Sequence, residues 1–211
     1  MRVDYRDIWV PDALVARPWF TGRMSAAVLV RKTDKEQPTL LFDESDAAFN
    51  GEKEYAEALR GILNSGYRRS GKASLCVGQG ANITDKDFST FGAKAITGIG
   101  ELPDTIADRA IPIKLKRRAK GEYVERFRER DAKIQVEPIR TALEAWATDA
   151  IYTLRAVRPS LPAALNDRAQ DVWEPLLAIA DLVSGVCARA AQQEDRWTRA
   201  RPLRRRPPRL R

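Results

Sequence analysis

Two adjacent carboxylates, Asp43 and Glu44, directly follow an apolar run, LLF at 40–42. Residues 39–42 have the length and composition of a buried strand, so both acids would lie at its carboxyl end. Carboxylates at that end of a parallel strand can hold Mg²⁺ and orient a water molecule for attack on a phosphoryl group. The alternative is that the two acids only cap the strand and begin a loop.

A phosphate-binding site also needs a loop of the pattern G-x-x-x-x-G-K-[ST], and residues 1–38 do not contain this pattern. Residues 66–72, GYRRSGK, have the spacing, but Ala73 stands where Ser or Thr would bind Mg²⁺. The order of the neighbouring elements also differs. A phosphate loop follows a strand and begins a helix, whereas residues 66–72 follow a helical pattern and precede a strand pattern. We therefore interpret it as a helix end with a basic turn. The sequence predicts half of a nucleotide site.

The composition excludes several classes of protein and of site. The chain has 211 residues, of which 44% are hydrophobic, and this suits one α/β domain with a helical appendage. It contains no histidine and two cysteines, Cys76 and Cys187, which excludes the common zinc sites and catalysis by imidazole. No apolar run approaches the roughly 20 residues that span a bilayer, so we expect a cytoplasmic protein that does not enter a membrane.

The formal net charge of +8 comes from the C-terminal end. Residues 196–211 hold eight arginines and no acid, and removing them from the 37 basic residues leaves 29, which equals the 29 acidic residues. Because prolines and few apolar residues accompany these arginines, we expect a disordered tail. Such a tail can bind nucleic-acid phosphates without sequence specificity.

The apolar patterns predict strands first and helices last. Strands are expected at 16–21, 39–42, 74–77, 93–99 and 111–115, with a polar loop between the third and the fourth. Helices are expected after Ser25, at 55–63, along an apolar stripe at 139–154, and at 172–180 with a kink or restart at Pro175. We expect an α/β core at 1–118, a helical lid at 119–190 and the tail at 191–211.

Six segments, in this order, resemble the domain of unknown function 3631, a P-loop ATPase-like domain of phage, plasmid and other mobile-element proteins that often accompanies primase or helicase modules. The segments are SAAVLVR (25–31), TLLFDESD (39–46), ALRGILNSGYRRSG (58–71), FSTFGAKAITGIGELPDTIADRAIPIKLKRR (88–118), GEYVERFRER (121–130) and DRAQDVWEPLLAIADLVSG (167–185). The resemblance spans about Arg17 to Gly185 and implies an incomplete P-loop NTPase sheet of the AAA+-like type with a C-terminal helical lid. Members carry a phosphate loop upstream, so the resemblance implies that this chain begins after it.

The resemblance also implies a set of site residues for Mg²⁺ and ATP. Asp43 would bind the metal, Glu44 would polarise water, and Thr97 would sense the γ-phosphate. Arg109 would act as an arginine finger towards a neighbouring subunit of an oligomer, and Arg168 would contact phosphate from the lid. The alternatives are an ion pair of Arg109 with the preceding residue and structural roles for Thr97 and Arg168.

Three functions follow from these observations. The first is a truncated ATPase-like domain related to replication or helicase proteins, inactive alone because no loop holds Mg²⁺-ATP. The second is an ATPase completed by a partner chain that carries the phosphate loop. The third is a non-catalytic module that binds nucleic acid or a partner through the basic tail. In the implied sheet the missing strand lies between the strand near Ile99 and the strand at 111–115, and its absence leaves inner edges unpaired.

The charge distribution generates a first prediction. Deleting residues 196–211 should abolish binding of the chain to DNA and remove its steep salt dependence, because the remaining residues sum to zero charge. Fluorescence anisotropy with labelled DNA across a salt series measures both quantities. Affinity that survives the deletion with the same salt slope would place the binding surface on the folded body.

Overall fold

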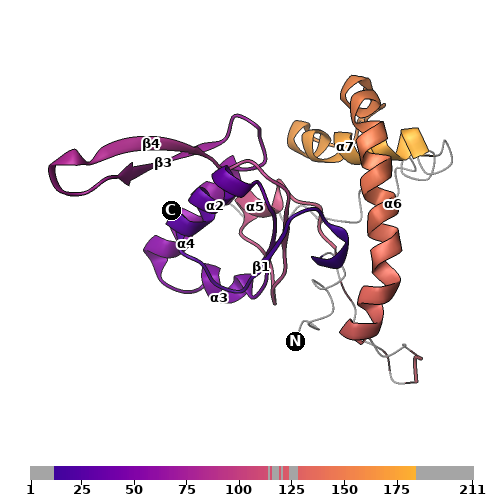
Figure 1. Ribbon diagram of the computed structural model, residues 1–211, viewed down its shortest axis with the longest axis horizontal. Coiled ribbons are helices and arrows are strands. Elements are labelled where there is room, and N and C mark those ends of the chain that lie inside the picture. The colour runs from indigo at the N-terminus through magenta and orange to yellow at the C-terminus, as the bar shows by residue number, and fades with distance from the viewer. Residues whose placement is uncertain (1–11, 114, 116–118, 120, 124–127, 184–211) are drawn as a thin grey trace, which may run out of the picture. The chain divides into compact units, whose positions relative to one another are not determined.

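The computed structural model describes residues 12–113, 115, 119, 121–123 and 128–183 (Figure 1). Its elements are β1 (Pro18–Thr21), α2 (Ala26–Glu36), β2 (Thr39–Phe42), α3 (Ser45–Phe49), α4 (Lys53–Ser65), β3 (Lys72–Val77), a 3₁₀ turn (Gly80–Asn82), β4 (Thr84–Ser89), β5 (Lys94–Ile96), α5 (Asp104–Ala107), α6 (Glu129–Ala156) and α7 (Asp167–Val183). The chain forms two compact units, Met1–Ala107 with Lys116–Thr148 and Asp108–Leu115 with Asp149–Arg211. Among the helices described, none is both long and apolar enough to cross a membrane.

The first unit contains a three-stranded parallel sheet of order β1-β2-β5. Thr39 to Phe42 of β2 pair in register with Pro18 to Thr21 of β1, and Leu40 to Phe42 pair with Lys94 to Ile96 of β5. The expected strands at 16–21, 39–42 and 93–99 are therefore confirmed, and the fold is mixed α/β. Because the strands are parallel, their carboxyl ends lie at one edge of the sheet.

Helices α2 and α4 cover one face of β2. Leu40 and Phe42 of the strand belong to a buried cluster with apolar residues of both helices, including Leu29 of α2 and Leu59 of α4. Leu41 alternates to the opposite face and is also fully buried. Burial on both faces explains why β2 reads as a continuous apolar run.

Local signals set the ends of these two helices as expected. The Ser25 side chain accepts a hydrogen bond from the Val28 amide at the start of α2. At its end Gln37 adopts a left-handed conformation, with φ 47°, and donates its amide to Thr33. Helix α4 ends at Ser65 with Gly66 as its cap.

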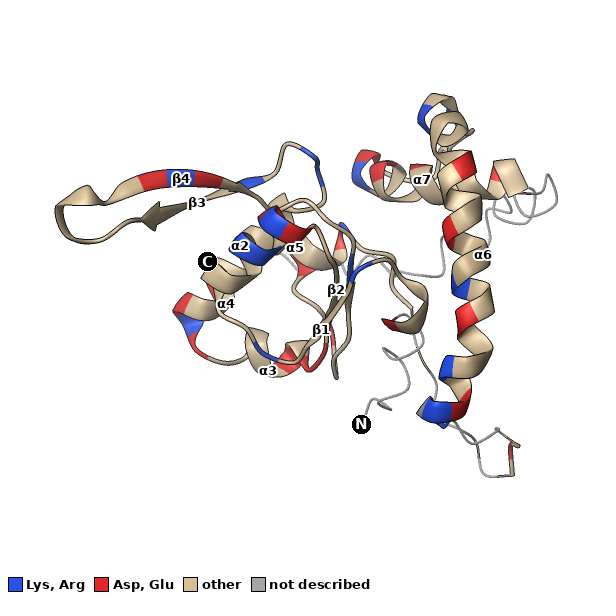
Figure 2. Ribbon diagram, viewed as in Figure 1, with Lys and Arg blue, Asp and Glu red and all other residues tan. Residues whose placement is uncertain are grey.

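Strands β3 and β4 form a two-stranded antiparallel ribbon that extends beyond α2 and α4 (Figure 1). The strand at 74–77 was expected, whereas residues 84–89 were expected to be a polar loop, and this expectation was wrong. The segment TDKDFS shows no alternation of apolar and polar residues, because Phe88 is its one buried residue. Its strand conformation comes from pairing with β3, from Lys72 opposite Ser89 to Val77 opposite Thr84. The ribbon tip has no charged residue (Figure 2).

The expected strand at 111–115 was also wrong for the residues that are described, 111–113 and 115, because none of them is in a strand. Pro112 has no amide hydrogen to donate to a sheet. Ile113 is 81% exposed and Leu115 is 55% exposed, so neither buries the apolar surface that would favour a core strand.

Helices α6 and α7 lie where the described part of the expected lid was predicted to be helical. Helix α7 runs through Pro175 without a break, so the expected restart does not occur there. The apolar stripe of α6 is covered in part, since Ala150 is buried whereas Ile139 and Leu143 are about half exposed.

Lys94 connects the start of β5 to two other segments of the first unit. Its Nζ donates hydrogen bonds to the carbonyl oxygens of Gly66, Thr90 and Gly92, at 3.1, 3.1 and 2.8 Å. These bonds join the end of α4 and the β4–β5 connection to the sheet. Burial lowers the pKa of Lys94 to about 8.

This pKa predicts how stability depends on pH. Between about pH 8 and pH 10.5 the unfolded chain holds the Lys94 proton and the folded chain has released it, so the free energy of unfolding should rise with pH. Relative to Lys94→Met, the wild-type chain should gain about 1–2 kcal/mol between pH 7.5 and pH 9.5. Urea unfolding of both proteins at the two pH values measures this difference. Parallel pH profiles would instead mean that the three carbonyl groups keep Lys94 charged.

Candidate functional site

Asp43 and Thr97 meet at the carboxyl ends of two adjacent parallel strands. Asp43 follows β2 directly, and Thr97 follows β5. The Thr97 hydroxyl donates a hydrogen bond of 2.6 Å to Asp43 Oδ1. The Thr97 amide donates to the carbonyl of Phe42, and the Asp43 amide donates to the carbonyl of Thr21 at the end of β1. The sheet thus brings together two of the five predicted site residues, from positions 54 apart in sequence.

Glu44 lies beside this pair but on the surface. It is exposed and forms the cap before α3, with a left-handed φ of 52°. Its amide donates to Asp43 Oδ1 at 2.9 Å. A non-glycine residue in this conformation is uncommon and is often found at functional sites. The turn separates the two adjacent acids, so that Asp43 faces Thr97 while Glu44 is free to contact solvent.

The start of α3 packs against the segment that follows Thr97. Ser45 donates its amide to the Thr97 carbonyl, and Asp46 Oδ1 accepts the Ile99 amide at 3.0 Å. A Cβ atom at Gly98 would lie 2.5 Å from Ser45 Oγ and 3.0 Å from Asp46 Oδ1, so only glycine fits there without a shift. The sequence interpretation gave no role to Ser45, Asp46 or Gly98. The repeated acid in DESD, three residues after Asp43, was the signal for Asp46.

The donor set at Asp43 fits Mg²⁺. Oδ1 of this half-buried carboxylate already accepts two hydrogen bonds, from Thr97 and Glu44, so a metal at Asp43 would bind through Oδ2. Mg²⁺ is commonly held by one or two carboxylates together with waters and substrate phosphates. Within the described residues no three His, Cys, Asp or Glu side chains gather as an all-protein metal site. The residues present therefore suit a metal that arrives with phosphate or keeps most of its waters.

The two predicted arginines belong to the second unit. Arg168, at the start of α7, forms an ion pair with Asp108, with Nη1 and Oδ2 3.8 Å apart. The two side chains are 56% and 35% exposed, so the pair contributes little stability. Arg109 is half-buried and directly follows Asp108. The predicted site residues thus form two groups, Asp43 with Glu44 and Thr97, and Arg168 with the segment that carries Arg109.

The rejected phosphate-loop match at 66–72 has the structure expected for a turn. Helix α4 ends at Ser65 and β3 begins at Lys72, the reverse of the order that a phosphate loop requires. The Gly71 amide donates to the carbonyl of Arg68 within the turn. The interpretation as a helix end and a basic turn is confirmed.

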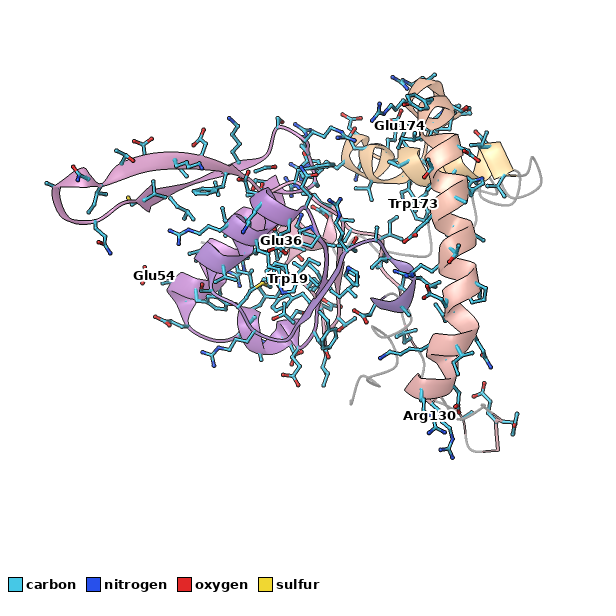
Figure 3. All side chains as sticks on the ribbon, viewed as in Figure 1. Trp19, Glu36, Glu54, Arg130, Trp173 and Glu174 are labelled. Atoms are coloured by element: carbon cyan, nitrogen blue, oxygen red, sulfur yellow. The ribbon has the colours of Figure 1, made fainter. Side chains whose placement is uncertain are left out.

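A surface pocket of about 440 Å³ lies at the opposite end of the parallel sheet from Asp43. It is lined in part by Trp19 and Glu36, which are labelled in Figure 3, and by Pro18 and Pro38 at the starts of β1 and β2. Lys32 Nζ lies 4.6 Å from the centre of the Trp19 ring. Because ligands of parallel sheets bind at the carboxyl ends of the strands, the Asp43 end remains the candidate site.

The close packing at Gly98 yields a prediction about stability. Gly98→Ala should lower the free energy of unfolding by about 1–3 kcal/mol, because the added methyl group overpacks the buried start of α3. Gly22→Ala is the matched control, since no atom lies within 4 Å of its added Cβ. Urea unfolding of the two variants measures the difference. Equal stabilities would show that the 97–99 segment is not held against α3.

Comparison with known proteins finds a similarity in the helical part of the chain. Residues 114–200, which contain α6 and α7, match the family model described as "Protein of unknown function (DUF3631)". The chain is 37% identical over 71 residues to an "Uncharacterized 28.9 kDa protein in xis 5'region" of Saccharopolyspora erythraea. This alignment covers 34% of the present chain and 26% of the relative, about a quarter of its length. No solved structure matches the chain.

The family match was expected from six sequence segments, and it is confirmed for the part that contains the last two of them. The expectation that the resemblance reaches back to about Arg17 stays a prediction. Residues 114–200 of this chain are therefore similar to the DUF3631 family of proteins of unknown function.

Proposed function

We propose that the chain is an ATPase-like domain of the P-loop NTPase type that retains the metal-binding half of a nucleotide site and does not hydrolyse ATP by itself. The observation that carries the proposal is the 2.6 Å hydrogen bond between Thr97 Oγ1 and Asp43 Oδ1. It joins the carboxylate of Asp43 to the hydroxyl of Thr97 at the carboxyl ends of adjacent parallel strands. This edge of a parallel sheet is where nucleotides and other ligands bind.

The proposal assigns a role to each residue of this half site. Asp43 would hold Mg²⁺ through Oδ2, and Thr97 would fix the carboxylate and report the position of a phosphate oxygen. Glu44, exposed beside Asp43, would orient a water molecule. Bound Mg²⁺ would supply charge neutralisation for a phosphoryl group. Arg109 is proposed to act as an arginine finger towards a neighbouring subunit of an oligomer, and Arg168 is proposed to contact phosphate from the lid.

We propose that the chain does not hydrolyse ATP by itself because it lacks the groups that hold the phosphates of a nucleotide. A phosphate loop binds through consecutive backbone amides and a lysine, and residues 1–38 have no such pattern. The match at 66–72 lies between a helix and a strand, so its amides do not begin a helix. The carboxylate of Asp43 and the hydroxyl of Thr97 provide no positive charge to balance the phosphates of ATP.

Metal binding provides the direct test of the half site. Mn²⁺, used as a paramagnetic substitute for Mg²⁺, should broaden the amide resonances of Asp43, Glu44 and Thr97 at millimolar concentration. Asp43→Asn should remove the broadening, because the ligand charge is lost. Glu54→Gln is the matched control, since Glu54 lies in the first turn of α4 and its loss should leave the effect unchanged. Equal broadening in wild type and Asp43→Asn would contradict the proposal.

Hydrolysis provides the second test. The purified chain should release phosphate from Mg²⁺-ATP no faster than buffer does, because the chain lacks the lysine and amides that stabilise the transferring phosphoryl group. A coupled phosphate assay measures the rate, with Glu44→Gln and Glu54→Gln as variants. Turnover that disappears only in Glu44→Gln would show that the chain holds a complete ATPase site.

A further inference from the structure

The residues of β3 direct alternate backbone groups away from the ribbon that β3 forms with β4 (Figure 1). At the base of the ribbon the Thr90 amide donates to the Gly71 carbonyl, so these two residues form a hydrogen-bonded pair. Hydrogen-bonded pairs alternate along an antiparallel ladder, so the amides and carbonyls of Lys72, Ser74 and Cys76 point away from β4. Among the described strands, β4 is the one that pairs with β3.

The outer edge of β4 is protected against pairing with a further strand. Its outward Ser89 amide is already used, because it donates to Asp34 Oδ1 of α2 at 2.8 Å. This bond agrees with the alternation, since Ser89 lies opposite Lys72. The middle of β4 carries consecutive charged residues at 85–87, whereas Lys72 is the one charged residue of β3. Charges on an edge strand commonly prevent further pairing, so the β3 edge is the open side of the ribbon.

The side chains of β3 indicate which strand would fit beside it. Ala73, Leu75 and Val77 pack against the buried cluster, whereas the residues that alternate with them are exposed. A strand added at this edge must repeat the alternation, or it would place polar side chains on the apolar face. β3 itself has this alternation over all six of its residues. A second copy of β3 therefore supplies the pattern that the edge requires.

Two antiparallel copies of β3 have a register that uses every outward backbone group. A two-fold axis at Ser74 places this residue opposite Ser74 of the second copy, and it places Lys72 opposite Cys76 in both directions. Each of these pairs makes two main-chain hydrogen bonds. Like charges do not face each other in this register, and on the apolar face Ala73 lies opposite Leu75. An axis at either neighbouring residue would leave part of the outward groups of β3 unpaired.

We propose that the outer edge of β3, at Lys72, Ser74 and Cys76, pairs antiparallel with the same edge of a second copy of this chain, so that two ribbons form one four-stranded sheet. Main-chain hydrogen bonds supply the affinity of this contact. The contact is isologous, because the same residues lie on both sides. It involves neither Asp43 nor the proposed arginine finger, so it does not rest on the proposed function.

Sedimentation equilibrium of the full chain, without nucleotide or metal, tests the dimer. The wild type should dimerise at submillimolar concentration, and Ser74→Pro should weaken dimerisation by about tenfold or more, because proline removes the central outward amide. Asp87→Pro is the matched control, since Asp87 lies opposite Ser74 and its outward amide is on the β4 edge. Both variants lose the hydrogen bond from Ser74 Oγ to Asp87 Oδ1, so a difference between them reports the edge.

A disulfide tests the register without a change in the backbone. In a chain whose own cysteines, Cys76 and Cys187, are replaced by serine, Ser74→Cys should form an intermolecular disulfide on mild oxidation. Directly opposed residues of a hydrogen-bonded pair have Cα atoms about 5.5 Å apart, within the range of about 4.4–6.8 Å that a disulfide spans. Asp85→Cys in the same background is the control, because it is exposed on β4 and should stay uncrosslinked.

Three results would overturn the proposal. The first is a wild type that stays monomeric at submillimolar concentration. The second is equal dimerisation of the two proline variants, whether both are weakened or both unchanged. The third is disulfide formation at Asp85→Cys as fast as at Ser74→Cys, which would indicate random collision and not a defined register.

Discussion

The pairing of β2 with a parallel strand on each side is the constraint on which the candidate site depends. β1 and β5 hold β2 in register, and apolar side chains fill both of its faces. A slip of one residue between β2 and β5 would turn Thr97 to the other face of the sheet and break its bond to Asp43. The 2.6 Å contact is thus a consequence of the register in which Leu40 to Phe42 pair with Lys94 to Ile96.

The loops after β2 and β5 then stabilise each other. Asp46 and Ser45 bond to the backbone after Thr97, while Glu44 turns away through its left-handed conformation. The polar groups at this edge are therefore arranged by hydrogen bonds within a few residues of the strand ends. A ligand that reached Asp43 would meet a carboxylate whose orientation is already fixed.

Much of this unit could be predicted from the sequence because its signals are local. The apolar run at 40–42, the helix start after Ser25 and the helix end at Gly66 are each determined within a few residues, and each prediction is confirmed. Strand β4 could not be predicted in this way, because a polar segment becomes a strand only through its partner β3. The predicted strand at 111–115 failed for a different reason. Its apolar residues predicted a buried strand, but Ile113 is exposed in the structure. The resemblance assigned Thr97 and Asp43 to one site, but the hydrogen bond between them was not predicted, because only strand pairing brings residues 54 apart into contact.

The ammonium group of Lys94 is engaged in hydrogen bonds within the first unit. Its ammonium group has three hydrogens, and three main-chain oxygens, of Gly66, Thr90 and Gly92, accept them. Reorienting this side chain towards an anion would strip the donors from all three carbonyl groups at once. Lys94 also lies at the start of β5, whereas Thr97 follows its end, so this segment brings a hydroxyl but no free ammonium group to the Asp43 end of the sheet. An anionic ligand at that end would need its counter-charge from a different segment.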